Sequence, residues 1–162
     1  MCRAATFLIF TMFLWNVLTK PSLAESPILL TVSTPDTTTE KVLLTDEDLA
    51  RLHQVSFSTS TIWTEGIFEF SGPSLASVLA LLGVSQGNVI LSAVNGYRIH
   101  IPWSVIEADA PIIAIRMNDE PFGIRQKGPI WIVFPYDSSA QYRQELIFAL
   151  SVWQLTEILV EQ

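Results

Sequence analysis

The sequence contains little cysteine, histidine or positive charge, and each shortage excludes a class of site. Cys2 is the only cysteine among 162 residues, so the chain cannot form an internal disulfide framework or a thiolate zinc site. Nine Lys and Arg residues against sixteen Asp and Glu residues give a net charge of −7. This charge argues against binding to nucleic acid, because phosphates require a basic surface. The 49% of apolar residues exclude a disordered tail and suffice for one domain with its own core.

The motifs of several common enzyme classes are also missing. The sequence has no Gly-x-Ser-x-Gly nucleophile elbow, no phosphate-binding loop and no dinucleotide-binding fingerprint. We interpret His53 as an ordinary residue at the end of a helix and His100 as an ordinary strand residue. Local motifs therefore indicate no catalytic site.

The first 24 residues differ from the rest of the chain. Arg3 precedes an apolar run from Ala4 to Leu18, which is followed by Lys20, Pro21 and the triplet Ser22-Leu23-Ala24. A positive start, a compact apolar segment and a small-residue site are typical of a cleavable secretory signal peptide. A membrane anchor is the alternative, but an apolar run of about fifteen residues is too short for a hydrocarbon core of roughly 30 Å.

We therefore expect a signal peptide at residues 1–24 and a mature exported domain at residues 25–162. Cleavage would remove Cys2, Arg3 and Lys20, so the mature chain would have no thiol and a net charge of −9. It would not stay inserted in a membrane after cleavage. A disulfide-free domain of this size depends for its stability on its hydrophobic core.

Alternating hydrophobicity and turn residues predict an α+β fold, a single strand-rich domain with mixed sheets and a few short helices. Thr45 is expected to cap a helix that ends near His53, because three acidic residues follow it. Further helices are predicted from Gly72-Pro73 to Gly83 and over 141–149. Asn95-Gly96 predicts a hairpin turn. Strands are expected at 28–32 (at a sheet edge), 41–44, 55–61, 88–94, 97–101, 111–117, 129–135 and 153–160.

Four short motifs follow one another along the chain. They are Ser71-Gly72-Pro73-Ser74-Leu75, Ala93-Val94-Asn95-Gly96-Tyr97, Asn118-Asp119-Glu120-Pro121-Phe122 and Gly128-Pro129-Ile130-Trp131. Each is weak alone, but their order and spacing over residues 40–160 resemble the molybdopterin-binding domain of the sulfite oxidase family. The resemblance implies the fold of that domain for nearly the whole mature chain.

The sequence departs from the catalytic members of that family at two places. Where those members have the Cys that ligates molybdenum, shortly before the glycine matching Gly72, this chain has the stretch Thr59-Ser60-Thr61. Hydroxyls replace a soft thiolate poorly at such a metal. The residue that is commonly Arg in the strand after Gly-x-Pro is Trp131 here. The resemblance therefore implies a member that is not an enzyme and binds no molybdenum.

The short, exported, cysteine-free members of this family are similar to periplasmic pterin-binding proteins that regulate membrane-bound signalling enzymes. By this resemblance we expect a periplasmic protein that binds a pterin. Its partner would be the periplasmic region of a membrane-bound cyclic-di-GMP cyclase, phosphodiesterase or sensor kinase. Two alternatives stay open: an interaction module that has lost its ligand site, and a molybdopterin-dependent oxidoreductase component that holds its cofactor without a Cys.

A pterin is a flat heterocycle with an edge of hydrogen-bond donors and acceptors, so its site needs an aromatic face. Trp131 is the first choice for this face, with core packing as the alternative, and Trp63 and Tyr97 are second choices. Trp103 and Trp153 are assigned to packing.

Polar residues near the four motifs complete the predicted ligand site. The cations could instead be ordinary surface charges, and Asn95 could serve the turn alone. The expected donors are Arg98, Arg125 and Lys127, and the expected partners of the ligand's edge are Asn95, Ser60, Thr61 and Glu65.

Overall fold

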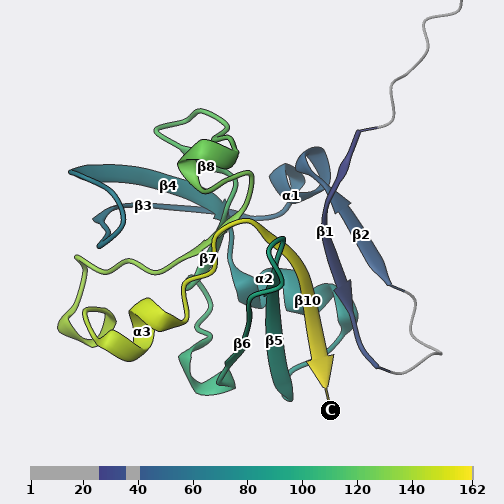
Figure 1. Ribbon diagram of the computed structural model, residues 1–162. Coiled ribbons are helices and arrows are strands. Elements are labelled where there is room, and N and C mark those ends of the chain that lie inside the picture. The colour runs from purple at the N-terminus through teal and green to yellow at the C-terminus, as the bar shows by residue number, and fades with distance from the viewer. Residues whose placement is uncertain (1–25, 36–40, 162) are drawn as a thin grey trace, which may run out of the picture.

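The computed structural model describes residues 26–35 and 41–161, and in these residues ten strands form three sheets (Figure 1). One strand pair is parallel and the others are antiparallel, and the helices are short. The α+β class with mixed sheets, predicted from the sequence, is therefore confirmed. The predicted signal peptide lies outside the described residues. No helix among residues 26–35 and 41–161 is long and apolar enough to cross a membrane.

The largest sheet has five strands in the order β2-β1-β10-β5-β6. These strands are β1 (Ile28–Ser33), β2 (Val42–Thr45), β5 (Asn88–Ala93), β6 (Arg98–Ile101) and β10 (Leu155–Glu161). The prediction of an edge position for the first strand is wrong, because β1 lies between β2 and β10. The last strand of the chain pairs with β1 in parallel and with β5 antiparallel, as Figure 1 shows. Such a long-range pairing leaves no local trace in the sequence of β1.

Two smaller sheets complete the fold. One has the order β3-β4-β8, and the other pairs β7 with β9. Their strands are β3 (Gln54–Ser60), β4 (Ile67–Pro73), β7 (Ile112–Ala114), β8 (Arg116–Met117) and β9 (Trp131–Val133). The single strand predicted over 111–117 is split at Ile115, whose N–H donates to the Ser71 carbonyl (2.9 Å). The split arises because β7 pairs with β9 whereas β8 pairs with β4.

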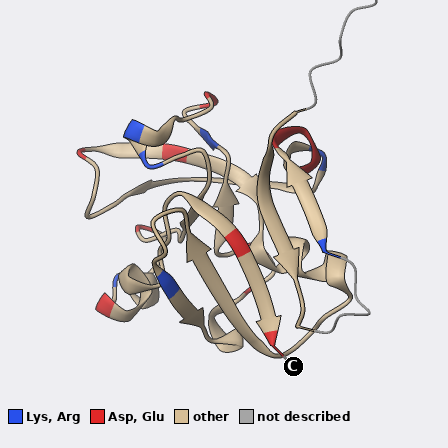
Figure 2. Ribbon diagram, turned by 45° about the vertical axis from the view of Figure 1, so that its right-hand side comes forward, with Lys and Arg blue, Asp and Glu red and all other residues tan. Residues whose placement is uncertain are grey.

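Helix α1 (Asp46–Arg51) begins as predicted, with Thr45 as its cap. The Asp48 N–H donates to Thr45 Oγ1 (3.2 Å), and the Thr45 N–H donates to the Asp48 carboxylate (3.0 Å). Figure 2 shows the acidic first turn of this helix. Arg116 of β8 binds it there, with both guanidinium nitrogens 2.7 Å from the two Asp46 oxygens. Hydrogen bonding to Arg116 lowers the pKa of Asp46 below its ordinary range.

The second and third helices differ from the predictions at their starts. Gly72 and Pro73 belong to β4, and α2 (Leu75–Leu79) begins after Ser74, whose hydroxyl accepts the Ser77 N–H (3.2 Å). The end at Gly83 is correct, because a short turn, η1 (Ala80–Leu82), ends there with Gly83 at φ +67°. The predicted third helix is divided. Its parts are η4 (Ala140–Tyr142) and α3 (Glu145–Ala149), and two further turns are η2 (Trp103–Val105) and η3 (Ile124–Gln126).

The hairpin predicted at Asn95-Gly96 joins β5 to β6. Gly96 has φ +82°, and Asn95 Oδ1 accepts the Tyr97 N–H (3.0 Å), which closes the turn. Below it, buried side chains of the five-stranded sheet, α2, β7 and β9 form one hydrophobic cluster. The sheets and α2 therefore share one core.

The glycine of the first sequence motif is required by a close approach of two strands. A Cβ at Gly72 would lie 2.0 Å from the backbone carbonyl oxygen of Ile113 in β7, whereas a Cβ at Gly123 would have nothing within 4 Å. We expect Gly72→Ala to lower the free energy of unfolding by about 1–3 kcal/mol, because the strands must separate. Gly123→Ala is the matched control, with a smaller expected loss, because it changes only the N-cap of η3 and the added methyl group meets no other atom. Urea unfolding of both variants measures this, and equal losses would contradict the assignment.

Candidate functional site

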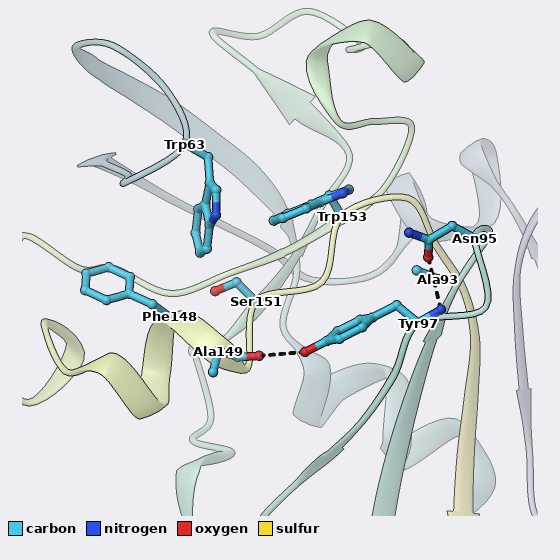
Figure 3. A pocket seen from close by; sticks show the side chains of 8 residues that line it. All are labelled: Trp63, Ala93, Asn95, Tyr97, Phe148, Ala149, Ser151 and Trp153. Atoms are coloured by element: carbon cyan, nitrogen blue, oxygen red, sulfur yellow. Dashed lines mark hydrogen bonds between the residues drawn. The ribbon is translucent and has the colours of Figure 1, made fainter.

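A cavity of about 260 Å³, which we call the aromatic pocket, lies beside the β5–β6 hairpin (Figure 3). In the view of Figure 3, Trp153 lies above the cavity, Tyr97 below it, and Trp63 and Phe148 to one side. These rings come from the segment before β10, the β5–β6 connection, the β3–β4 loop and α3. The pocket is lined by Trp63, Ala93, Asn95, Tyr97, Phe148, Ala149, Ser151 and Trp153.

The loop that carries Trp63 is held by hydroxyl and carboxylate groups. The Ser60 N–H (2.6 Å) and hydroxyl (3.0 Å) donate to the Asp137 carboxylate, which also accepts from Arg143 (2.7 Å). The Trp63 N–H donates to the Thr61 hydroxyl (3.1 Å). Hydrogen bonds from the Ser60 N–H and then from Arg143 lower the pKa of Asp137 below its ordinary value of 3.8. The carboxylate is therefore ionised at neutral pH and fixes the start of the loop.

Trp63 is the centre of the aromatic cluster. Its ring meets four other rings edge to face, at centroid distances of 5.8 Å (Trp131), 6.3 Å (Tyr136), 6.1 Å (Phe148) and 5.5 Å (Trp153). Edge-to-face contacts of this kind are stabilising beyond their area. They fix the ring at the mouth of the aromatic pocket.

Uncharged polar groups lie between these rings. The Tyr97 hydroxyl donates to the Ala149 carbonyl over a long 3.4 Å, and the Ser151 hydroxyl bonds with the Tyr136 hydroxyl. Burial raises the pKa of Tyr136 to about 12, so this phenol stays protonated. Together with Asn95, these groups offer hydrogen-bond donors and acceptors in an otherwise apolar cavity.

Two further cavities adjoin the aromatic pocket. The loop pocket shares Trp63 with it, and the Asp137 pocket shares Phe148. The loop pocket is lined by Trp63, Thr64, Glu65, Phe68, Met117, Arg125, Gln126 and Lys127, and the Asp137 pocket by Ser60, Thr61, Ile62, Tyr136, Asp137, Arg143 and Phe148. The Lys127 ammonium lies 5.3 Å from the centroid of the Trp153 ring.

Most residues predicted for the ligand site come together around Trp63. Trp63, Asn95 and Tyr97 line the aromatic pocket; Glu65, Arg125 and Lys127 line the loop pocket; Ser60 and Thr61 line the Asp137 pocket. Arg98 is exposed on β6 and lines none of the three cavities. That these residues bind a ligand stays a prediction.

Trp131, the first choice for the aromatic face, lies in the core and has no exposed surface. Phe70 meets its ring edge to face at 5.4 Å, and Trp63 meets it at 5.8 Å. All three residues of β9 are buried, so neither face of this strand opens to a cavity. Trp131 therefore packs in the core, which was the alternative prediction, and its choice as the aromatic face is wrong. The aromatic face of the candidate site consists of other rings.

Trp153, Phe148 and Ser151 line the aromatic pocket, although no sequence pattern indicates them for a site. Trp153 packs against the core, as predicted, and also lines the cavity. Its position depends on the return of β10 between β1 and β5, which brings the segment before β10 against the hairpin: the Val94 N–H donates to the Gln154 carbonyl (2.9 Å). No local motif signals this placement.

The stretch Thr59-Ser60-Thr61, where the sequence resemblance implies the position of a metal-binding Cys, carries a hydroxyl with two hydrogen-bond partners. Thr59 is completely buried; its Oγ1 accepts the Asp137 N–H (3.1 Å) and donates to the Ser60 carbonyl (3.2 Å). Such a donor does not fit a soft metal that prefers thiolate. Within residues 26–35 and 41–161, no three His, Cys, Asp or Glu side chains gather as a metal site.

Comparison with known proteins identifies a similar fold. No family model matches the sequence. No curated protein matches it. Among solved structures, the sulfane dehydrogenase SoxCD from Paracoccus pantotrophus is similar, with a TM-score of 0.60 and 16% identity. The match covers 82% of this chain and 37% of the SoxCD chain, so this chain spans little more than a third of that length. The similarity supports the molybdopterin-binding type of fold that the sequence motifs imply.

The burial of Trp131 predicts a large effect on stability. Its indole N–H has no hydrogen-bond partner among the described residues, so the side chain stabilises by packing alone. We expect Trp131→Ala to lower the free energy of unfolding by about 3–5 kcal/mol, because it leaves a cavity between Phe70 and Trp63. Trp103→Ala, at a partly buried tryptophan on η2, should cost clearly less. Urea denaturation measures the free energy of unfolding of both variants. Similar losses in the two would contradict core packing at Trp131.

Proposed function

We propose that this protein is a non-catalytic pterin-binding protein of the periplasm that senses a pterin and regulates a membrane-bound signalling partner. The observation that carries the proposal is the aromatic pocket, in which Trp63, Tyr97, Phe148 and Trp153 surround a cavity of limited size. Flat heterocycles bind well between such rings.

The size of the aromatic pocket favours a small ring system. Its volume of about 260 Å³ is below the roughly 300–1,000 Å³ typical of sites for drug-sized ligands. A cavity of this size suits a ligand of one or two fused rings better than a dinucleotide. A pterin belongs to this class.

The polar groups of the aromatic pocket suit the edge of a pterin. The Asn95 amide can donate, and the Tyr97 and Ser151 hydroxyls and the Ala149 carbonyl can accept. The described residues that line the pocket are all uncharged, so the lining offers no ion-pair partner to a charged ring. An amino-pyrimidine edge has both donors and acceptors and is neutral in its common form.

The absence of catalysis, the export and the signalling partner rest on the sequence. The Thr59-Ser60-Thr61 stretch in place of the metal-binding Cys supports a non-enzymatic role, and the signal peptide predicted at 1–24 supports export. The resemblance to pterin-binding regulators supports a partner that is the periplasmic region of a cyclic-di-GMP cyclase, a phosphodiesterase or a sensor kinase.

Mass spectrometry of the ligand released from the purified protein distinguishes this proposal from its alternatives. A bound pterin would support it. Stoichiometric molybdenum would support an oxidoreductase component instead. A protein that neither carries a pterin nor binds added pterin would support an interaction module without a ligand site.

Replacing Trp153 tests the location of the ligand. We expect Trp153→Leu to weaken pterin binding by about 1–3 kcal/mol, by analogy with base–aromatic stacking, because it removes one face of the aromatic pocket. Trp103→Leu is the matched control, since Trp103 lines none of the three described cavities, and its affinity should equal that of the wild type. Titration of pterin fluorescence measures both. Unchanged affinity in the folded Trp153→Leu protein would place the ligand elsewhere.

Regulation requires that the ligand change the affinity for the partner. Coupling of the usual size would alter partner affinity by about 5–150-fold when pterin is bound. The measurement is calorimetry with the periplasmic region of a candidate membrane-bound signalling enzyme, with and without pterin. Trp153→Leu should reduce the pterin effect at a fixed pterin concentration. Equal partner affinity with and without pterin would remove the sensing role and leave the binding role intact.

A further inference from the structure

We infer that Lys127 sets the charge preference of the aromatic pocket: its ammonium group disfavours cationic rings and favours neutral or anionic ones. The inference rests on the proposed function, because it concerns the ligand class of the same pocket. It goes beyond that function because it assigns a specificity role to one side chain.

Without Lys127, the aromatic pocket would suit a cation. Four aromatic rings around a small cavity form the arrangement that recognises quaternary ammonium groups, since each ring face attracts positive charge. The acidic net charge of the chain would favour the same kind of ligand. A pocket for a neutral heterocycle therefore needs a feature that discriminates against cations.

Lys127 is fixed in a position to do this. Its ammonium nitrogen lies 5.3 Å from the centroid of the Trp153 ring. Its backbone has φ +71°, its N–H donates to the Ile124 carbonyl (3.1 Å), and its carbonyl accepts the Gln154 N–H (3.1 Å). Because Gln154 directly follows Trp153, this last bond holds the lysine backbone beside the ring that its side chain covers.

The charge of Lys127 acts on the aromatic pocket from a neighbouring cavity. Lys127 lines the loop pocket and not the aromatic pocket, so it occupies no ligand space. It engages the electron-rich indole of Trp153 and repels a second cation nearby. Glu65 also lines the loop pocket, but no ion pair joins it to Lys127 among the described residues. The ammonium charge is therefore not neutralised by a direct partner.

An isosteric pair of probes measures this preference. Trimethylphenylammonium carries a charge, and tert-butylbenzene has the same shape without it. We expect Lys127→Met to raise the affinity for the cation relative to the neutral probe by about 2–20-fold, the range given by charges roughly 10 Å apart at effective dielectric constants between 80 and 20. Quenching of tryptophan fluorescence measures both affinities. Methionine keeps the length of the side chain and leaves the backbone hydrogen bonds in place.

Two control variants make the test specific. Lys127→Arg keeps the charge over Trp153, and Arg125→Met removes an exposed charge that lines the same loop pocket without a described ring contact. Both should keep the wild-type ratio of cation to neutral affinity. A ratio in Arg125→Met that rises as much as in Lys127→Met would show an effect of net charge and overturn the role of Lys127.

The remaining outcomes separate this inference from the proposed function. An unchanged ratio in Lys127→Met, with pterin bound by the wild type, overturns the inference and leaves the function intact. A raised ratio, with pterin bound by no variant, supports the inference and removes the function. Binding of neither probe by any variant overturns the inference, and the proposed function is then decided by pterin binding alone.

Discussion

The insertion of β10 between β1 and β5 is the constraint on which the candidate site depends. It brings the segment before β10 against two others through the backbone of Gln154, which accepts the Val94 N–H (2.9 Å) and donates to the Lys127 carbonyl (3.1 Å). The first residue of β10, Leu155, donates its N–H to the Ile130 carbonyl (3.2 Å). These bonds place Trp153 between the β5–β6 hairpin and the loop that carries Lys127. The pairing of β10 with β1 and β5, which joins the two halves of the five-stranded sheet, thus also forms the aromatic pocket.

The second support of the site is the loop between β3 and β4. The Ser60 N–H donates to the Asp137 carboxylate, which Arg143 also binds, and the Thr61 and Thr64 hydroxyls bond to each other. This arrangement lets Trp63 lie over the buried Trp131 while part of its ring stays at the surface. The hydroxyls of Thr59, Ser60 and Thr61 all serve the structure of this loop and its neighbours.

The features that could be predicted from the sequence are those set by neighbours along the chain. The Thr45 cap, the Asn95-Gly96 turn and the end of the second helix at Gly83 each depend on contacts within a few residues. Other features depend on pairings between distant segments, which local patterns do not indicate. They are the internal position of β1, the burial of Trp131 and the position of Trp153 at the aromatic pocket.

Arg98 is a simple example of a site residue that the sequence predicts and the fold does not place in the pocket. Tyr97 precedes β6 in the hairpin and lines the aromatic pocket, whereas Arg98, the first residue of β6, is exposed and lines none of the three cavities. The charge of Arg98 made it a natural candidate for a ligand donor, whereas the geometry of the strand excludes it from the pocket. The order of the motifs predicts the region of the candidate site. The pairing of the strands determines which side chains line it.

The contact between Trp63 and Trp153 has an optical consequence. The two indoles lie 5.5 Å apart with an angle of 68° between their planes, and they belong to segments that meet only through the tertiary fold. Two aromatic transitions held this close couple to each other, and the resulting circular-dichroism couplet depends on their mutual orientation. The molecule therefore contains an internal chromophore pair whose signal reports the geometry of this junction without any added label.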